Sequence, residues 1–328
     1  MVEEMTTTVA EGDEFVAQFD PYRRELLAHC YRMTGSIHDA EDLVQETYIR
    51  AWKGYGKFEG RSSMRTWLYR IAINTCLTAL EGRSRRPLPT GLGAPSSDPS
   101  DDLIERHEIS WLEPIADSDL SDSGDPASIV VGRASIRLAF IAALQHLSPR
   151  QRAALLMREV LQWKASEVAD ALATTTTAVN SLVQRARAQL DSITPSEDGV
   201  VEPSSAQIQE LLEKYVDSFE RYDIGQLVEL FTTDAVWEMP PFVGWYQGGE
   251  NIGALIRGNC PANGPGDMRM LPTAANGRPA YGLYMRNESG RHVAFQLHVL
   301  DFRANRVAHV ASFFDLTLFE RFGLPAHL

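Results

Sequence analysis

Apolar residues in the first part of the chain are spaced as they are in amphipathic helices. Between residues 40 and 52 they recur at i, i+3, i+4, i+7 and i+8, which places them on one helical face. Ser36 with Asp39 three residues later predicts the start of this helix, and Gly54 with Gly56 predicts its end. A second apolar stripe predicts another helix over residues 65–80, so residues 14–86 are expected to form one helical module.

A second helical module is expected over residues 133–192. Ser148, Pro149 and Gln151 have the spacing of a capping box with proline at the first helical position. A short apolar stretch at 168–172 predicts a second helix, and a turn of four threonines separates it from a third helix that runs to Leu190. Two short helices around such a turn predict a helix-turn-helix.

The pattern changes after residue 203. Helices are predicted at 207–222, 224–231 and 250–257, and strand-like runs at 235–239, 280–286, 292–303 and 306–316. Helices followed by a long antiparallel meander indicate an α+β domain over residues 204–328, in which a curved sheet wraps around a helix. The predicted fold class is therefore multidomain, with two all-α modules followed by an α+β domain.

The stretch between the two helical modules, residues 87–132, is rich in proline, serine and aspartate. This composition predicts an acidic linker that is extended and largely disordered, with at most a helical turn at 103–111. An acidic segment between basic modules is either a solubilising spacer or a mimic of nucleic acid that occupies a basic channel.

Charge is distributed unevenly along the chain. The net charge is −13, which would disfavour nucleic acid as a partner if it were spread evenly. Residues 61–86, however, carry six basic and one acidic side chains, and residues 133–192 carry eight and four. Because phosphate contacts depend on the local field within about 8 Å, these two basic islands are candidate DNA-binding surfaces.

The first module carries the most specific motif. The sequence DAEDLVQETYIRAW (residues 39–52), followed by RTWLYRIAIN (residues 65–74), resembles region 2 of extracytoplasmic-function sigma factors of bacterial RNA polymerase. The resemblance implies that a polar helix face binds the core polymerase; its candidate residues are Asp39, Asp42, Gln45, Glu46 and Arg50. A solvated helix face is the alternative when charge pattern alone is considered.

Basic and aromatic residues in and around the second helix suit binding of single-stranded DNA, because arginines neutralise phosphates and aromatic rings stack on exposed bases. The resemblance implies that this region melts and captures the downstream promoter element. Its candidate residues are Arg61, Arg65, Trp67, Arg70, Asn74, Arg83, Arg85 and Arg86. For Trp67 taken alone, a place in the core is the better interpretation.

The helix-turn-helix resembles sigma region 4, which reads the upstream promoter element, in its sequences LSPRQR and AVNSLVQRAR. Small polar residues at the start of the third helix suit base edges, and arginines further along suit phosphates. The candidate residues are Thr176, Thr177, Asn180, Gln184, Arg185 and Arg187. Lys164, Asn180 and Leu182 depart from the common pattern, which leaves the base preference open.

The C-terminal sequence resembles the SnoaL-like cone fold of the nuclear-transport-factor-like superfamily, in MPPFVGWYQG (residues 239–248) and NGRPA (residues 276–280). The residues expected to line a cone pocket are Trp237, Trp245, Tyr246, Tyr284 and His298. Candidates for proton transfer are His298, His309, Asp234 and Asp315, but their spacing selects no acid–base pair. We therefore expect no catalytic residues, no cofactor and no metal, and a regulatory role for this domain.

No apolar run is long enough to span a bilayer and the first residues are acidic, so a cytoplasmic protein without a membrane partner is expected. The three cysteines are far apart in sequence and predict neither a disulfide framework nor a zinc site. The predicted function is a sigma factor that binds core RNA polymerase and promoter DNA, with intramolecular contact between the C-terminal domain and the sigma modules. The alternative is an enzyme or ligand sensor fused to a helix-turn-helix regulator.

Overall fold

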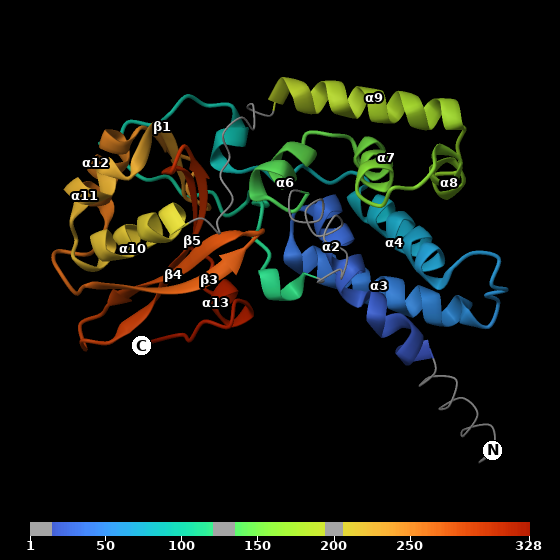
Figure 1. Ribbon diagram of the computed structural model, residues 1–328, viewed down its shortest axis with the longest axis horizontal. Helices are drawn as coiled ribbons and strands as arrows, with labels where there is room; N and C mark the ends of the chain where they lie inside the picture. The colour runs from blue at the N-terminus through green and yellow to red at the C-terminus, as the bar shows by residue number, and fades with distance from the viewer. Residues whose placement is uncertain (1–14, 121–134, 194–205) are drawn as a thin grey trace, which may run out of the picture. The chain divides into compact units, whose positions relative to one another are not determined.

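The computed structural model describes residues 15–120, 135–193 and 206–328, and the chain divides into two compact units (Figure 1). Unit 1 combines Met1–Arg86 with Asp119–Thr194, and unit 2 combines Pro87–Ser118 with Pro195–Leu328. Residues 121–132 of the expected linker and the first residues of the three expected domains lie outside the described residues.

The first helical module comprises η1 (Asp20–Tyr22), α2 (Arg23–Thr34), α3 (Ile37–Tyr55) and α4 (Met64–Leu80). Two of its helices, α3 and α4, were predicted from their apolar stripes, whereas η1 and α2 were not. The Ser36 hydroxyl accepts a hydrogen bond from the Asp39 backbone N–H at 3.1 Å, which confirms the predicted start of α3.

The second helical module contains α6 (Leu138–Leu144), α7 (Pro149–Glu159), α8 (Ala165–Ala171) and α9 (Thr176–Ile193). The predicted capping box of α7 is confirmed: Ser148 N–H donates to Gln151 Oε1 at 3.0 Å, and Gln151 N–H donates to the Ser148 hydroxyl at 3.4 Å. The predicted helix-turn-helix is formed by α8 and α9. Sequence periodicity did not predict α6, which is only seven residues long.

The two helical modules pack against each other within unit 1, along a contact that we call the seam. Its centre is the buried side chain of Arg152 on α7, whose guanidinium donates to the Met33 carbonyl at the end of α2. Arg152 also donates to Gln145 Oε1 at 2.9 Å and to the Leu147 carbonyl at 3.2 Å. Arg32 of α2 donates to the Ser135 hydroxyl at 3.1 Å, so residues more than 100 positions apart meet in one buried polar contact.

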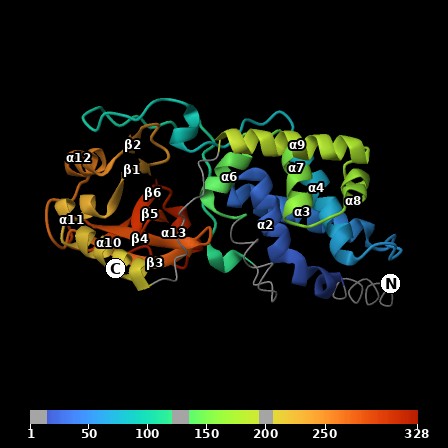
Figure 2. The same ribbon diagram turned by 45° about the horizontal axis from the view of Figure 1, so that its top comes forward.

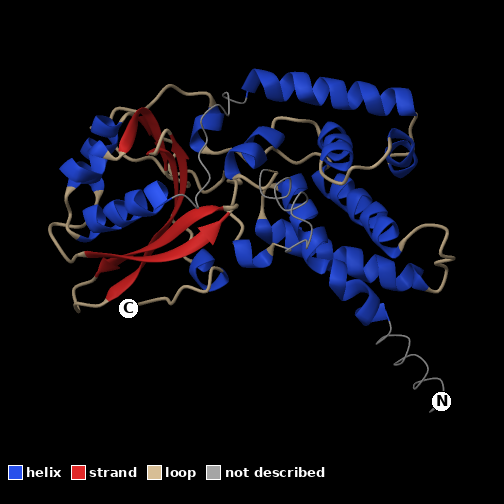
Figure 3. Cartoon of the chain, viewed as in Figure 1, coloured by secondary structure: helices blue, strands red, loops and turns tan. Residues whose placement is uncertain are grey.

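Unit 2 is an α+β domain in which helices pack against a six-stranded sheet (Figures 2 and 3). Its helices are α10 (Ala206–Glu220), α11 (Ile224–Glu229), α12 (Gly249–Asn259) and α13 (Thr317–Arg321). Its strands are β1 (Phe231–Glu238), β2 (Trp245–Gln247), β3 (Met268–Ala275), β4 (Arg278–Arg286), β5 (His292–Arg303) and β6 (Arg306–Phe313). Tyr215 and Phe219 of α10 are buried in the same core as Trp237 of β1.

The sheet order is β2-β1-β6-β5-β4-β3. Strands β4 to β6 form the predicted antiparallel meander, β3 extends it as an edge strand next to β4, and β1 pairs with β6 in parallel. The sequence did not predict β2 or β3. Strand β2 has only three residues, and β3 contains Pro272, which an edge strand tolerates because one side of its backbone has no strand partner.

The prediction of a disordered linker is wrong for residues 87–118, which we call the strap. The strap belongs to unit 2, and its teal trace follows the end of the sheet near β1 and β2 (Figure 2). Leu112 and Ile115 are completely buried. No helix forms at 103–111, where the backbone makes a single turn with Ile109 N–H donating to the Arg106 carbonyl at 3.3 Å, and Glu105 forms an isolated antiparallel bridge with Phe242. A few apolar anchors and backbone hydrogen bonds therefore order a segment whose composition indicates disorder.

Candidate functional site

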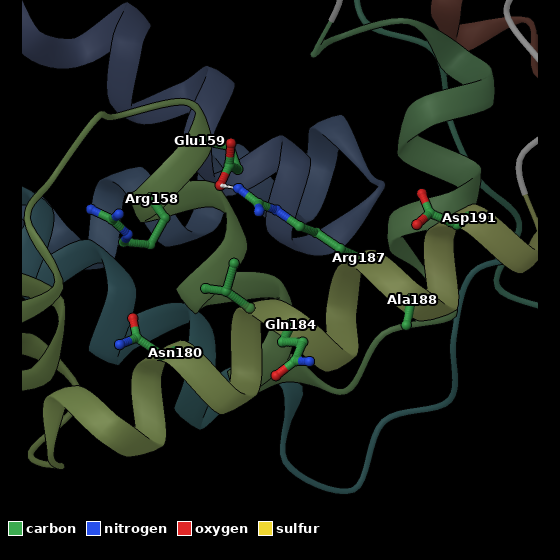
Figure 4. A pocket seen from close by; sticks show the side chains of 8 residues that line it. Arg158, Glu159, Asn180, Gln184, Arg187, Ala188 and Asp191 are labelled. Carbon is green, nitrogen blue, oxygen red and sulfur yellow. Dashed lines mark hydrogen bonds and ion pairs between the residues drawn. The ribbon is translucent and has the colours of Figure 1, made fainter.

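A groove on the second helical module contains three of the predicted DNA-reading residues (Figure 4). Its volume is about 440 Å³, and it lies between the end of α7 and the middle of α9. The residues that line it are Arg158, Glu159, Asn180, Val183, Gln184, Arg187, Ala188 and Asp191. The apolar stripe of α9 buries Val179, Val183 and Ala186, which turns the polar face of the helix outward.

Arginines and hydrogen-bonding side chains share this surface. Arg187 forms an ion pair with Glu159 at 2.5 Å, and both side chains are substantially exposed. Arg185 is exposed and its Nε–H donates to the Ser181 carbonyl at 3.2 Å. Thr176 and Thr177 are exposed at the start of α9. Such a surface can contact base edges at one end of the helix and phosphates further along.

Sequence reasoning missed Arg158 and Glu159 as part of this surface. They end α7, and a charged pair there has the same appearance in sequence as any solvated helix end. Arg158 donates to the Trp163 carbonyl and so holds the loop that follows α7. The two arginines of the groove therefore come from two helices, and the two acids Glu159 and Asp191 balance their charge.

The basic residues of α4 are only partly free. Arg65 forms an ion pair with Glu25 of α2 at 2.8 Å and lies over the Tyr69 ring, 4.9 Å from its centroid. Trp67 is half-buried and packs against Phe58, with ring centroids 4.9 Å apart. This supports the interpretation of Trp67 as a packed residue.

The other members of this predicted set have varied surroundings. Asn74 is exposed, Arg70 is half-buried, and Arg61 forms an exposed pair with Glu59 at 2.8 Å. Asn74 and Arg61 are therefore accessible to a partner from solvent.

Two arginines that follow α4 contact Asp39, a residue predicted to belong to the polymerase-binding surface. Arg83 and Arg86 both contact the Asp39 carboxylate, at 3.0 and 2.8 Å. Arg85 contacts Nδ1 of His146, in the second module, at 2.7 Å. The structure thus brings together one predicted polymerase-binding residue and two predicted DNA-binding residues, which the sequence analysis placed on separate surfaces.

The rest of the predicted polymerase face lies on the polar side of α3. Asp42 and Gln45 are exposed, and Glu46 accepts a hydrogen bond from Arg50 Nε at 2.6 Å. Their helix is anchored by Leu43, Val44 and Thr47, which are buried on its opposite side. An exposed polar face on a firmly packed helix is suited to docking a partner protein.

Two of the expected cone-pocket residues, Trp237 and His298, lie together in the core of unit 2. Their ring centroids are 5.2 Å apart, and His298 Nδ1 is 2.9 Å from the Tyr215 hydroxyl. Burial lowers the pKa of His298 to about 3, so this imidazole is neutral near pH 7. Neither Trp237 Nε1 nor His298 Nε2 has a hydrogen-bond partner among the described residues.

Of the other three expected pocket residues, Tyr246 is buried in the same core and pairs with Trp237 across β1 and β2, whereas Tyr284 and Trp245 lie elsewhere. Tyr284 is buried against Phe319, and its hydroxyl donates to the Pro325 carbonyl at 2.8 Å. Trp245 donates from Nε1 to the Ala94 carbonyl of the strap at 3.0 Å, and Tyr246 is the next residue of the same short strand. The structure therefore brings Tyr246 beside Trp237 and Trp237 against His298, and it leaves Tyr284 and Trp245 apart from them.

The candidates for proton transfer are also separated from one another. His309 Nε2 lies 2.7 Å from Glu238 Oε1; burial opposes protonation of His309, but the hydrogen bond and charge of Glu238, with Asp301 nearby, outweigh burial and raise its pKa. Asp234 forms an exposed pair with Arg303. Asp315 accepts from the Thr317 hydroxyl at 2.6 Å.

Cys30 and Cys76, far apart in sequence, lie with their sulfurs 3.7 Å apart in the core of the first module as free thiols. Among the residues described by the structure, no group of three or more His, Cys, Asp and Glu side chains has an arrangement that could hold a metal ion. No helix in the described part of the chain is both long enough and apolar enough to cross a bilayer.

Comparisons with known proteins match both helical modules. Residues 18–86 match the family Sigma-70 region 2, and residues 137–190 match Sigma-70, region 4. The chain is therefore built as a sigma factor, the class of protein that directs RNA polymerase to promoters.

The relatives narrow this class. The chain is 63% identical over 316 residues to the ECF RNA polymerase sigma factor SigG of Mycobacterium tuberculosis (strain CDC 1551 / Oshkosh). The aligned residues cover 96% of this chain and 85% of SigG. It is 26% identical over 258 residues to SigJ of M. tuberculosis strain H37Rv, covering 76% and 75% of the two chains. The chain belongs to the extracytoplasmic-function sigma factors of RNA polymerase.

A solved structure has a similar fold. The crystal structure of M. tuberculosis SigJ aligns with a TM-score of 0.63 at 22% sequence identity, covering 94% of this chain and all of that one. The similarity concerns the fold, and it extends over helical modules and C-terminal domain alike.

Proposed function

We propose that this sigma factor binds core RNA polymerase through the exposed face of α3 and promoter DNA through α4 and α9. The observation that carries the proposal is the exposure of Thr176, Thr177, Asn180, Gln184, Arg185 and Arg187 on one packed helix. Three of these residues line a groove that Arg158 also enters. Exposed donors and acceptors beside arginines suit recognition of a duplex, because base edges and phosphates are then reached from the same helix.

The proposed polymerase contact uses Asp42, Gln45, Glu46 and Arg50. Asp39 is a weaker candidate, because its carboxylate is shared by Arg83 and Arg86. Conversely, the N–H groups of Arg83 and Arg86 that hold Asp39 become available to DNA phosphates only when they release it. We propose that DNA competes with these ion pairs when the promoter is engaged.

A charge-reversal experiment tests the polymerase contact. Asp42→Arg combined with Glu46→Arg should abolish co-purification with core polymerase while leaving unit 1 folded, because both positions lie on the solvent side of α3. Glu210→Arg with Glu213→Arg on exposed positions of α10 changes the net charge equally and serves as the control. Undiminished co-purification of the α3 variant would remove this face from the polymerase interface.

We also propose that the C-terminal domain regulates promoter access and has no chemistry of its own. The proton-transfer candidates are separate: His298 contacts Tyr215, His309 contacts Glu238, and Asp234 contacts Arg303. Deleting residues 204–328 should change transcription several-fold with purified core polymerase and a cognate promoter. The alternative, an enzyme or ligand sensor fused to a regulator, requires turnover or ligand binding without polymerase, and the same purified chain can be assayed for both.

A further inference from the structure

The strap is bound to the C-terminal domain mainly through its backbone. Ser97 N–H donates to the Trp245 carbonyl at 2.7 Å, and Arg106 N–H donates to the Pro241 carbonyl at 3.0 Å. In the opposite sense, Val243 N–H donates to the Ile104 carbonyl at 3.0 Å. These contacts lie on residues 239–248, the first of the two C-terminal motifs seen in the sequence.

The second motif, residues 276–280, begins at the turn between β3 and β4, and the strap binds there too. Asn276 exchanges two hydrogen bonds with Ile115: its backbone N–H donates to the Ile115 carbonyl at 3.0 Å, and its Oδ1 accepts from Ile115 N–H at 3.1 Å. Asn276 is fully buried with φ of +55°, and the Asp117 carboxylate accepts from Gly277 N–H at 2.8 Å. A hairpin tip, normally solvated, is here covered by the strap.

The two ends of the strap are held close together. Leu112 N–H donates to the Pro87 carbonyl at 3.0 Å, so the 24 residues between them form a closed loop on unit 2. Thr90 N–H, just inside the loop, donates to the buried Glu238 carboxylate at 2.9 Å. The residues of this loop therefore no longer add to the length of the connection between the first helical module and the second.

We propose that the C-terminal domain acts as a clip that shortens the connection between the two helical modules and thereby favours their packing at the seam. With the strap bound, about 24 residues rather than about 50 connect Arg86 to the second module. Because the probability of ring closure falls as the −3/2 power of length, this shortening favours the packed modules about threefold. The inference deepens the proposed regulatory role and names its device.

A matched pair of substitutions in the strap of the full chain tests the clip. Ile115→Asp places a charge at a completely buried position, whereas Ile104→Asp makes the same change at a side chain that is 54% exposed. Asn276→Gly is a milder second variant, because glycine adopts the positive φ but removes the acceptor for Ile115 N–H. It keeps the test valid if Ile115→Asp fails to fold.

Two measurements read the result. Hydrogen exchange reports whether the amides of Ser97, Arg106 and Ile115 are released. Distances between spin labels on the exposed positions Thr78 of α4 and Asp170 of α8, in a Cys260→Ser background, report the ratio of separated to packed modules.

We expect Ile115→Asp to expose the strap amides and to raise the separated-to-packed ratio about threefold, by the closure scaling above, while Ile104→Asp changes neither. Strap release with an unchanged ratio would overturn the clip, and so would an equal effect of Ile104→Asp. Rapid exchange of the strap amides in the unaltered protein would also overturn it. None of these outcomes depends on transcription, so a failed clip is distinguishable from a failed regulatory role.

Discussion

Replacing Arg152 with methionine should separate the two helical modules more effectively than any other single substitution on α7. The side chain is 3% exposed, and its guanidinium holds three acceptors: the Met33 and Leu147 carbonyls and Gln145 Oε1. Only the Met33 carbonyl belongs to the first module. The substitution therefore removes a contact across the seam together with the local contacts that orient it.

The magnitude follows from two opposing effects. Leaving three buried acceptors without a donor costs about 1–3 kcal/mol each. Against this, burial lowers the pKa of Arg152 to about 10, so removing the charged guanidinium relieves a desolvation penalty on the order of 3 kcal/mol. The cost of the three unsatisfied acceptors exceeds the desolvation penalty that is relieved, so we expect a net destabilisation of unit 1 by about 3 kcal/mol.

Urea unfolding followed by hydrogen exchange can measure this change, because exchange resolves unit 1 from unit 2 in the full chain. Arg150→Met is the matched control on the same helix: Arg150 is exposed and makes one hydrogen bond, to the Leu172 carbonyl at 2.7 Å. The control should cost about 1 kcal/mol or less. A loss for Arg152→Met below about 1 kcal/mol, or equal to that of the control, would refute the assignment of the seam to Arg152.

Further predictions concern DNA binding and pH. Arg185→Ala or Arg187→Ala should lower promoter affinity of the holoenzyme and reduce the salt slope by about one unit per lost phosphate contact; an unchanged slope would show that these arginines do not touch phosphate. Changes at Thr177 or Asn180 should alter the preferred upstream sequence in a binding-site selection, and an unaltered preference would place the reading residues elsewhere. For His298 the folded pKa of about 3 lies below the unfolded value of 6.5, so the unfolded chain takes up the proton first. The stability of unit 2 is then full above pH 6.5 and falls below it by up to ~1.4 kcal/mol per pH unit, a slope that His298→Asn should remove and that urea unfolding at pH 5 to 7 can test.

The regular elements with strong local signals were predictable from the sequence. The α3 stripe, its Ser36 cap and the α7 capping box depend on residues within a few positions of one another, and β5 was predicted over its observed range, His292–Arg303. The exposed face of α9 could likewise be predicted, because a buried stripe fixes which side chains point outward. These features need no knowledge of tertiary contacts.

Contacts between distant segments could not be predicted. The seam joins Arg152 to Met33, and nothing near either residue in sequence indicates the other. Asp39 was assigned to a polymerase face from the motif around it, but its carboxylate is held by arginines more than 40 positions away. A residue's type and neighbours therefore suggested its chemistry, whereas the fold decided which partner it meets.

The strap shows why composition was misleading. Disorder is expected where too few apolar groups are available to offset the entropy of ordering, and this segment has few. It is ordered because the C-terminal domain supplies backbone partners at the turn of Asn276 and along residues 239–245, which any sequence could use. Most of its acidic side chains consequently remain exposed, among them Asp98, Asp101 and Glu108. Binding through the backbone leaves both sequence-based interpretations of the acidic linker open, a solubilising spacer and a mimic of nucleic acid. Release of the strap from the C-terminal domain lengthens the connection between the two helical modules and leaves the same acidic side chains exposed. The strap can therefore shorten the connection when it is bound and act through its charge when it is released.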